Sequence, residues 1–137
     1  MEFKEILSQP MMDDLLSSIY WEHAFFREMY VLSPSFIYPD GSRQVNPDAP
    51  ANIGLLIQTF DPHHPALEFR LKEVEKISIS FNRDIKPKGL VLRDCIELHF
   101  SETEIVRAKS IEFRIVEKEE AYGDRIRYGK YWDELFE

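Results

Sequence analysis

The feature that most constrains the fold of this chain is a strict alternation of apolar and polar residues in its second half. Four segments show it, at residues 67–72, 77–81, 95–100 and 111–115. Successive side chains of a strand point to opposite faces, so this period of two predicts strands with one buried face and one polar face. Because short connections join these segments, including a tight turn at 101–104, we expect antiparallel pairing. Residues 82–89 are interpreted as a polar connection between two of these strands.

The first half of the chain predicts a helix followed by two further strands. Pro10 suits the first turn of a helix over residues 10–23, whose apolar side chains recur at three- and four-residue steps from Met12 to Ile19. Residues 26–33 are rich in aromatic and β-branched side chains and predict a strand. Residues 53–60 are apolar on both faces, which is typical of a central strand, and a turn follows at 61–65.

Between these two strands lies a long irregular stretch, residues 33–52, which contains four prolines. A loop of this length is unusual in a compact domain and often has a function. The segment Tyr38-Pro39-Asp40-Gly41 could form a turn between two short strands, with residues 43–45 as the second.

Together these elements predict a single α+β domain over residues 1–137. We expect the N-terminal helix to pack on roughly six or seven mostly antiparallel strands, in a twisted sheet that forms a β-sandwich or half-barrel. The length of 137 residues and the absence of a composition break indicate one domain. The predicted core consists of Leu15, Leu16, Ile19, Val31, Leu55, Ile57, Leu67, Phe69, Ile77, Ile79, Phe81, Ile96, Leu98, Phe100, Ile111, Phe113 and Ile115.

Charge and cysteine content limit the possible partners and the compartment. The 25 acidic and 17 basic residues give a net charge of −8, which disfavours binding to nucleic acid or to an anionic membrane and attracts a cationic protein. A negative surface could also serve solubility alone. The single cysteine, Cys95, cannot form an internal disulfide, and the acidic N-terminus does not resemble a signal peptide. With no long apolar stretch either, we expect a cytoplasmic protein.

The standard motifs of catalysis and cofactor binding are absent from the sequence. It contains no glycine-rich phosphate loop, no Gly-x-Ser-x-Gly elbow, no His-Glu-x-x-His and no Cys-x-x-Cys. We therefore predict no catalytic residue, no cofactor and no metal.

Two groups of side chains are nevertheless candidates for ligand binding. Cys95, Glu97 and His99 share one face of a strand, although residues four apart lie about 13 Å from each other. One metal or proton relay cannot bridge that distance, so the polar face of an amphipathic strand is the preferred interpretation. His63 and His64 lie in a proline-flanked turn, which also fits an ordinary surface loop.

Aromatic residues indicate a possible protein-binding surface. Tyr and Trp are enriched at interface hot spots. The candidate residues are Tyr38, Asp40 and Arg43 in the proline-rich loop and Tyr128, Tyr131 and Trp132 in the C-terminal tail. Alternatively, the tail packs on the open side of the sheet.

Three segments, residues 27–35, 47–50 and 74–81, resemble small uncharacterised bacterial proteins of the toxin-immunity type. The resemblance is one of pattern, with one helix, a twisted antiparallel sheet and an acidic surface. It implies stoichiometric binding to a toxin, and it transfers no catalytic residue.

Two functions from different classes follow from the sequence. The first is a non-enzymatic domain that binds a partner protein, with immunity-like inhibition as its sharpest form, or that forms a homo-oligomer. The alternative is a small enzyme or small-ligand binder with a pocket on the concave face of the sheet, using His63, His64, Glu97 or His99.

Overall fold

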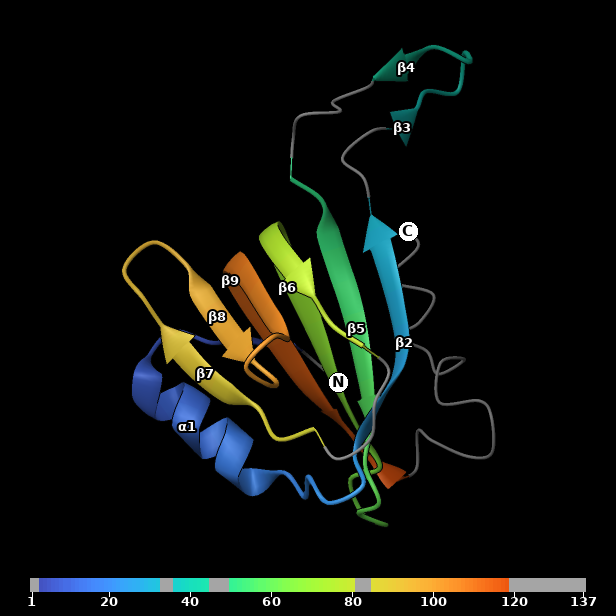
Figure 1. Cartoon of the computed structure of the whole chain (residues 1–137). Coiled ribbons are helices and arrows are strands. Elements are labelled where there is room, and N and C mark those ends of the chain that lie inside the picture. Colours follow the sequence, from blue (N-terminus) through green and yellow to red (C-terminus); the bar gives the residue numbers. More distant parts are fainter. Residues whose placement is uncertain (1–2, 33–35, 45–49, 81–84, 119–137) are drawn as a thin grey trace.

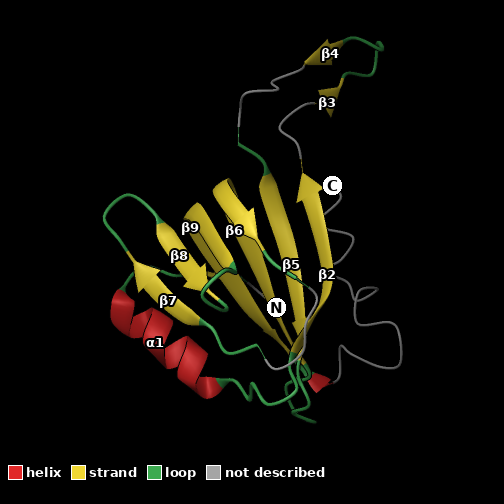
Figure 2. Cartoon of the chain, in the orientation of Figure 1, coloured by secondary structure: helices red, strands yellow, loops and turns green. Residues whose placement is uncertain are grey.

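A computed structural model describes residues 3–32, 36–44, 50–80 and 85–118. The elements, shown in Figures 1 and 2, are β1 (Lys4–Glu5), α1 (Gln9–Ser18), β2 (Phe25–Leu32), β3 (Phe36–Ile37), β4 (Arg43–Gln44), β5 (Asn52–Gln58), β6 (Ala66–Ser78), β7 (Lys88–Val91), β8 (Ile96–His99) and β9 (Ile105–Val116). Seven strands form one open antiparallel sheet in the order β2-β5-β6-β9-β8-β7, with β1 paired to β9. The predicted α+β class and antiparallel sheet are confirmed.

Helix α1 begins as predicted but ends earlier. Ser8 caps it, because its Oγ accepts a hydrogen bond from the Met11 N–H at 3.3 Å. The helix was expected to reach residue 23, yet it ends at Ser18, and Ile19 is already extended. The Trp21 indole N–H donates to the Leu16 carbonyl oxygen at 2.7 Å, which satisfies one of the carbonyls left unpaired at the helix end. The apolar stripe thus continues beyond the helix in an extended segment.

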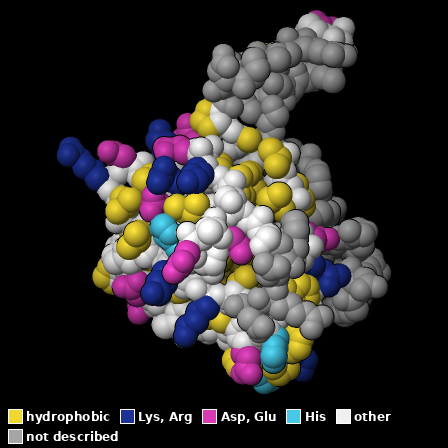
Figure 3. Space-filling model, viewed as in Figure 1, with side chains coloured by type: hydrophobic (Ala, Val, Ile, Leu, Met, Phe, Trp, Pro, Cys, Tyr) yellow, Lys and Arg dark blue, Asp and Glu magenta, His cyan; other side chains and the backbone are white. Residues whose placement is uncertain are grey.

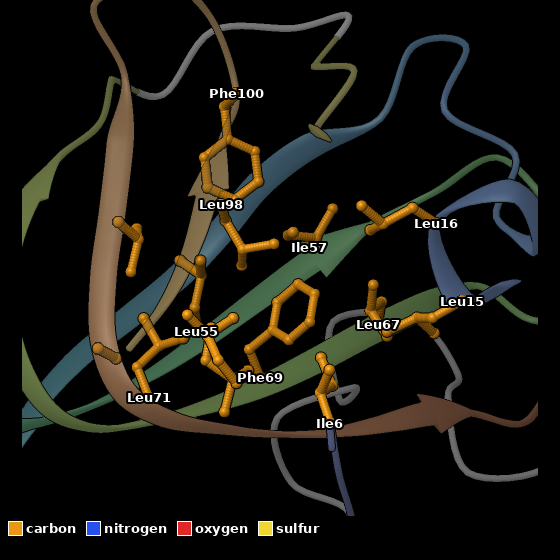
Figure 4. Close-up of a cluster of buried hydrophobic side chains, with 14 of the residues drawn as sticks. Ile6, Leu15, Leu16, Leu55, Ile57, Leu67, Phe69, Leu71, Leu98 and Phe100 are labelled. Atoms are coloured by element: carbon orange, nitrogen blue, oxygen red, sulfur yellow. The ribbon is translucent and has the colours of Figure 1, made fainter. Parts of the chain in front are cut away.

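The central pair of strands is longer than expected. The strand predicted at 67–72 and the first two residues of the one predicted at 77–81 belong to one strand, β6, which ends at Ser78 and whose pairing with β9 shifts between Val74 and Lys76. Glu73, just before this irregularity, has a left-handed φ of 50°, and its N–H donates to Asn52 Oδ1 at 2.9 Å. The polar residues between the two predicted strands therefore form a bulge instead of a turn. Strand β9 bends sharply along its length (Figure 4).

The far edge of the sheet contains a strand that the alternation did not predict. Residues 88 and 89, interpreted as part of a polar connection, begin β7. Helix α1 packs against this strand (Figure 1). A Cβ atom at Gly89 would overlap the side chain of Met12, so only glycine permits this close approach.

The buried side chains of the core face follow the predicted alternation (Figure 4). The expected polar face differs in part, because Glu68, Glu97 and Arg114 on it are buried as well. Predicted core residues that are buried are Leu15, Leu16, Leu55, Ile57, Leu67, Phe69, Ile96, Leu98, Phe100 and Ile111. Those that are half-buried against this cluster are Ile19, Ile77, Ile79, Phe113 and Ile115. Val31 is 58% exposed, so that prediction is wrong: it lies on β2, which pairs only with β5 among the described strands. Phe81 lies outside the described residues.

The loop at 33–52 contains the short hairpin β3–β4, which extends away from the ends of β2 and β5 (Figure 1). Its turn is held by a hydrogen bond from the Tyr38 N–H to the Ser42 carbonyl oxygen at 2.8 Å. Gly41 has a φ of 87°, a left-handed conformation that favours glycine. The predicted turn is confirmed, and the predicted second strand begins as expected at Arg43.

Candidate functional site

The outer face of β7, β8 and β9, which points away from the main core, gathers polar side chains from three strands. Lys88 on β7 lies opposite His99 on β8, and Leu90 lies opposite Glu97. On its other side, Glu97 lies opposite Arg107 of β9. Because alternate residues of a strand share a face, all five side chains belong to the same surface.

Glu97 is the centre of a charged network on this face. Its Oε2 accepts a hydrogen bond from Arg107 Nε at 2.6 Å, and its Oε1 lies 2.9 Å from His99 Nε2. Glu97 is only 7% exposed, whereas the side chains of Arg107 and His99 are more than a third exposed. Hydrogen bonds from His99 and Arg107 lower the pKa of the Glu97 carboxyl, and the same contact raises the pKa of Arg107. Each carboxylate oxygen therefore has one partner, and the two contacts together orient the Glu97 side chain.

Beside this network lies an open cavity of about 390 Å³, which we call the β7–β8 pocket. Its lining residues are Lys86, Lys88, Leu90, His99, Phe100, Ser101 and Glu102. Phe100 is nearly buried and makes an edge-to-face contact with Phe26, with ring centroids 4.8 Å apart. The Phe100 ring thus packs in the core, and Leu90, 44% exposed, is the apolar side chain of the lining that is open to solvent. Figure 3 shows hydrophobic, acidic and basic side chains intermixed on the visible face of the molecule.

The structure divides the four predicted ligand-binding residues into two sets. Glu97 and His99 are in direct contact, as described above. His63 and His64 lie in the β5–β6 turn, where the His63 N–H donates to Asp61 Oδ1 at 2.9 Å. His64 Nδ1 lies 3.2 Å from Glu117 Oε2, and His64 lines a different cavity of about 130 Å³. No contact among the described residues joins the two sets.

The Asp61 carboxylate explains the shape of the β5–β6 turn. The backbone hydrogen bond from His63 lowers the pKa of Asp61, because it stabilises the ionised carboxylate. This is the geometry of an Asx turn, in which an aspartate side chain substitutes for a backbone acceptor. The hydrogen bond from His63 to Asp61 therefore stabilises the turn itself.

Cys95 does not join Glu97 and His99 in one site. It lines a separate cavity of about 380 Å³ between the start of β8 and the end of β1. The polar-face interpretation of this strand is confirmed in part, because Glu97 and His99 lie on the outer face while Ile96 and Leu98 are buried.

The predicted partner-binding residues are only partly described. Tyr38 is 41% exposed at the tip of the β3–β4 hairpin. Asp40 Oδ1 accepts hydrogen bonds from the N–H and the hydroxyl of Ser42, at 2.9 and 2.6 Å, and these bonds lower the pKa of Asp40. The backbone of Arg43 pairs with Ile37. The tail residues Tyr128, Tyr131 and Trp132 lie outside the described residues.

The sequence interpretation missed four residues of this face: Lys86, Lys88, Leu90 and Arg107. The sequence contained a signal for Arg107, because the 101–104 turn fixes the register of the two strands that it joins. In an antiparallel hairpin, each step back along the first strand is matched by one step forward along the second. Once Phe100 bonds Glu104, as its N–H does at 2.9 Å, Glu97 must lie opposite Arg107. The other three required the pairing of β7 with β8, which no alternation indicated.

The described side chains do not assemble a recognisable catalytic centre. Ser101 is the nearest hydroxyl along the strand from His99, but its Oγ accepts hydrogen bonds from the N–H groups of Thr103 and Glu104, at 3.3 and 3.1 Å. It therefore stabilises the β8–β9 turn. Within residues 3–32, 36–44, 50–80 and 85–118, no group of three or more His, Cys, Asp or Glu residues is placed to hold a metal ion.

Comparison with known proteins adds no relative. No model of a protein family, no curated protein and no solved structure matches this chain. Over the described part of the chain, no helix has the length and apolar character needed to cross a membrane.

Proposed function

We propose that this chain is a non-enzymatic domain that binds a partner protein, and that the β7–β8 pocket is part of the interface. The observation that carries the proposal is the pocket itself, in which exposed Leu90 lies beside the charged network of Glu97. Protein interfaces combine an apolar anchor with preorganised charged groups, and arginine is enriched among them.

The state of Glu97 favours binding over catalysis. A general base works best when its pKa lies near the operating pH. The contacts with His99 and Arg107 lower the pKa of Glu97, so this carboxylate is a weaker base. The same arrangement suits recognition, because a rigid charged surface loses little side-chain entropy when a partner binds.

The other surfaces named from the sequence remain part of the proposal. Tyr38 at the tip of the β3–β4 hairpin is exposed and could extend the interface, and the acidic surface could speed association with a cationic region of the partner. The resemblance to toxin-immunity proteins agrees with stoichiometric binding of this kind.

The bend of the sheet supports the half-barrel form of the predicted fold. Strand β9 pairs with β6 along its full length and bends on the way (Figure 4). We propose that this bend turns the β7–β8 end over the core, so that the outer face of these two strands becomes a convex surface open to a partner.

A substitution in the pocket tests the proposed function. The tagged protein is captured from the cells that produce it, as wild type, as Leu90→Asp and as Leu7→Asp. Leu7 is a matched control, because it is 73% exposed and lines a different cavity. We expect one stoichiometric partner with the wild type and with Leu7→Asp, and loss of that partner with Leu90→Asp. Equal capture by all three proteins, or by none, would contradict the proposal.

A further inference from the structure

We infer that the β7–β8 pocket recognises an acidic segment of the partner protein that also carries an apolar side chain. This inference rests on the proposed function and specifies the chemistry of the partner. It concerns a surface whose charge is opposite to that of the chain as a whole, since the protein has a net charge of −8.

The first argument is the distribution of charge around the pocket. The lining contains two lysines, Lys86 and Lys88, but only one carboxylate, that of Glu102. Both lysines are exposed, and neither takes part in an ion pair within the described residues. In contrast, Arg107 is already bonded to Glu97. Two ammonium groups are thus available to an incoming anion.

The second argument is the position of these lysines. They flank Pro87, which is buried, so the backbone that carries them is anchored to the protein. Lys88 is also fixed in register opposite His99 by the pairing of β7 with β8. Ammonium groups on an anchored backbone lose less conformational freedom on binding than groups on a free loop.

The third argument is the apolar part of the lining. Leu90 on β7 is 44% exposed, so it offers an aliphatic surface next to the lysines. A small inorganic anion would use the lysines but leave this apolar surface exposed to water. A peptide segment with carboxylates next to an aliphatic side chain would use both.

A peptide titration tests the inference. The probe is a synthetic peptide that alternates glutamate and leucine, and a matched peptide with lysine in place of glutamate is the negative control. Binding is followed at low salt by the amide NMR shifts of the whole chain and by calorimetry. We expect the glutamate peptide to shift the amides of Lys88, Leu90 and His99 first, and the lysine peptide to leave them unchanged.

Charge reversal in the pocket gives the second arm. The double variant Lys86→Glu/Lys88→Glu should weaken binding of the glutamate peptide by about tenfold or more, because attraction becomes repulsion. The control variant Lys4→Glu/Lys109→Glu makes the same change in net charge away from the pocket, and it should retain most of the affinity. Equal weakening by the two variants, shifts confined to other strands, or binding of both peptides alike would overturn the inference.

The two proposals fail separately. If Leu90→Asp abolishes partner capture while the glutamate peptide does not bind, the interface stands and the acidic specificity is wrong. If the peptide binds as described but no partner depends on Leu90, the pocket recognises acidic segments and the proposed interface is wrong.

Discussion

At the scale of single residues, Glu97 forms two contacts, and the sequence of its own strand indicates only one of them. Its spacing from His99 is visible in the sequence, and its contact with Arg107 follows from the register of the hairpin. The two contacts together orient this carboxylate and lower its pKa, which supports the proposal that the site is a recognition surface.

The lowered pKa of Glu97 predicts a pH-dependent effect of the Glu97→Gln variant. A carboxyl whose pKa is lower in the folded state contributes stability above its ordinary value of 4.5, and this stability is lost as the pH falls through the folded-state pKa. At pH 7 we expect Glu97→Gln to lower the free energy of unfolding by about 1 kcal/mol, a figure that allows for the partial exposure of its partners. In strongly acidic solution the two proteins should converge.

Urea denaturation across this pH range measures the effect. Glu102→Gln is the control, because it makes the same chemical change at an exposed position in the β8–β9 turn. A Glu97→Gln difference that stayed constant from neutral to acidic pH would show that the carboxylate charge does not matter.

Glu73 supplies a second prediction at the residue scale. Its φ of 50° is unfavourable for a side chain that carries a Cβ, whereas glycine adopts this region freely. We expect Glu73→Gly to leave the free energy of unfolding unchanged or to raise it by up to about 1 kcal/mol. The matched change Glu75→Gly, two residues along the same strand, should lower it by about 0.5–1 kcal/mol. Thermal unfolding of both variants decides the matter, and a larger loss for Glu73→Gly would contradict the strain argument.

At the scale of elements, the edge strand β7 is stabilised by a side chain in place of a neighbouring strand. Gln9 Nε2 donates to the Gly89 carbonyl oxygen at 2.9 Å, and its Oε1 accepts from the Val91 N–H at 2.8 Å. One amide side chain therefore satisfies two of the backbone groups at this edge of β7. An edge without such a cover would be open to pairing with other chains.

The Gln9→Ala variant tests this role. We expect a loss of about 1–2 kcal/mol in the free energy of unfolding, because two backbone groups lose their partners. Hydrogen exchange at the Val91 amide should become faster in the variant than in the wild type, by more than exchange at the core amides of β6 does. Asp13→Ala is the control, since it removes only the exposed 2.9 Å bond between Asp13 and Gln9. Unchanged exchange at Val91 in Gln9→Ala would contradict the account.

At the scale of the whole molecule, the sequence predicted the faces of the strands better than their connections. Alternation identified the buried sides of β6, β8 and β9 because burial of one face imposes a period of two. It divided β6 in two, because the polar residues around Glu73 have the composition of a turn although Asn52 and the bulge hold them in the sheet. Propensity cannot distinguish these outcomes, since the deciding contact comes from a residue 21 positions away.

The sequence likewise predicted only part of the candidate site. Glu97 and His99 could be placed on one polar face, because both lie on a single strand. The lysines of the β7–β8 pocket could not, since they reach this face only through the packing of α1 on β7 and the pairing of β7 with β8. Sites built across several strands depend on long-range pairing, which local patterns do not encode.

The measurement that tests the central claim most directly is site-specific photo-crosslinking in the cells that produce this protein. A photoreactive side chain is placed at position 90, in the β7–β8 pocket, and in a separate variant at position 17, on the exposed side of α1. We predict one discrete adduct with a different protein from position 90 and none from position 17. No adduct from position 90, the same adducts from both positions, or an adduct between two copies of this chain would contradict the claim that the pocket binds a partner protein.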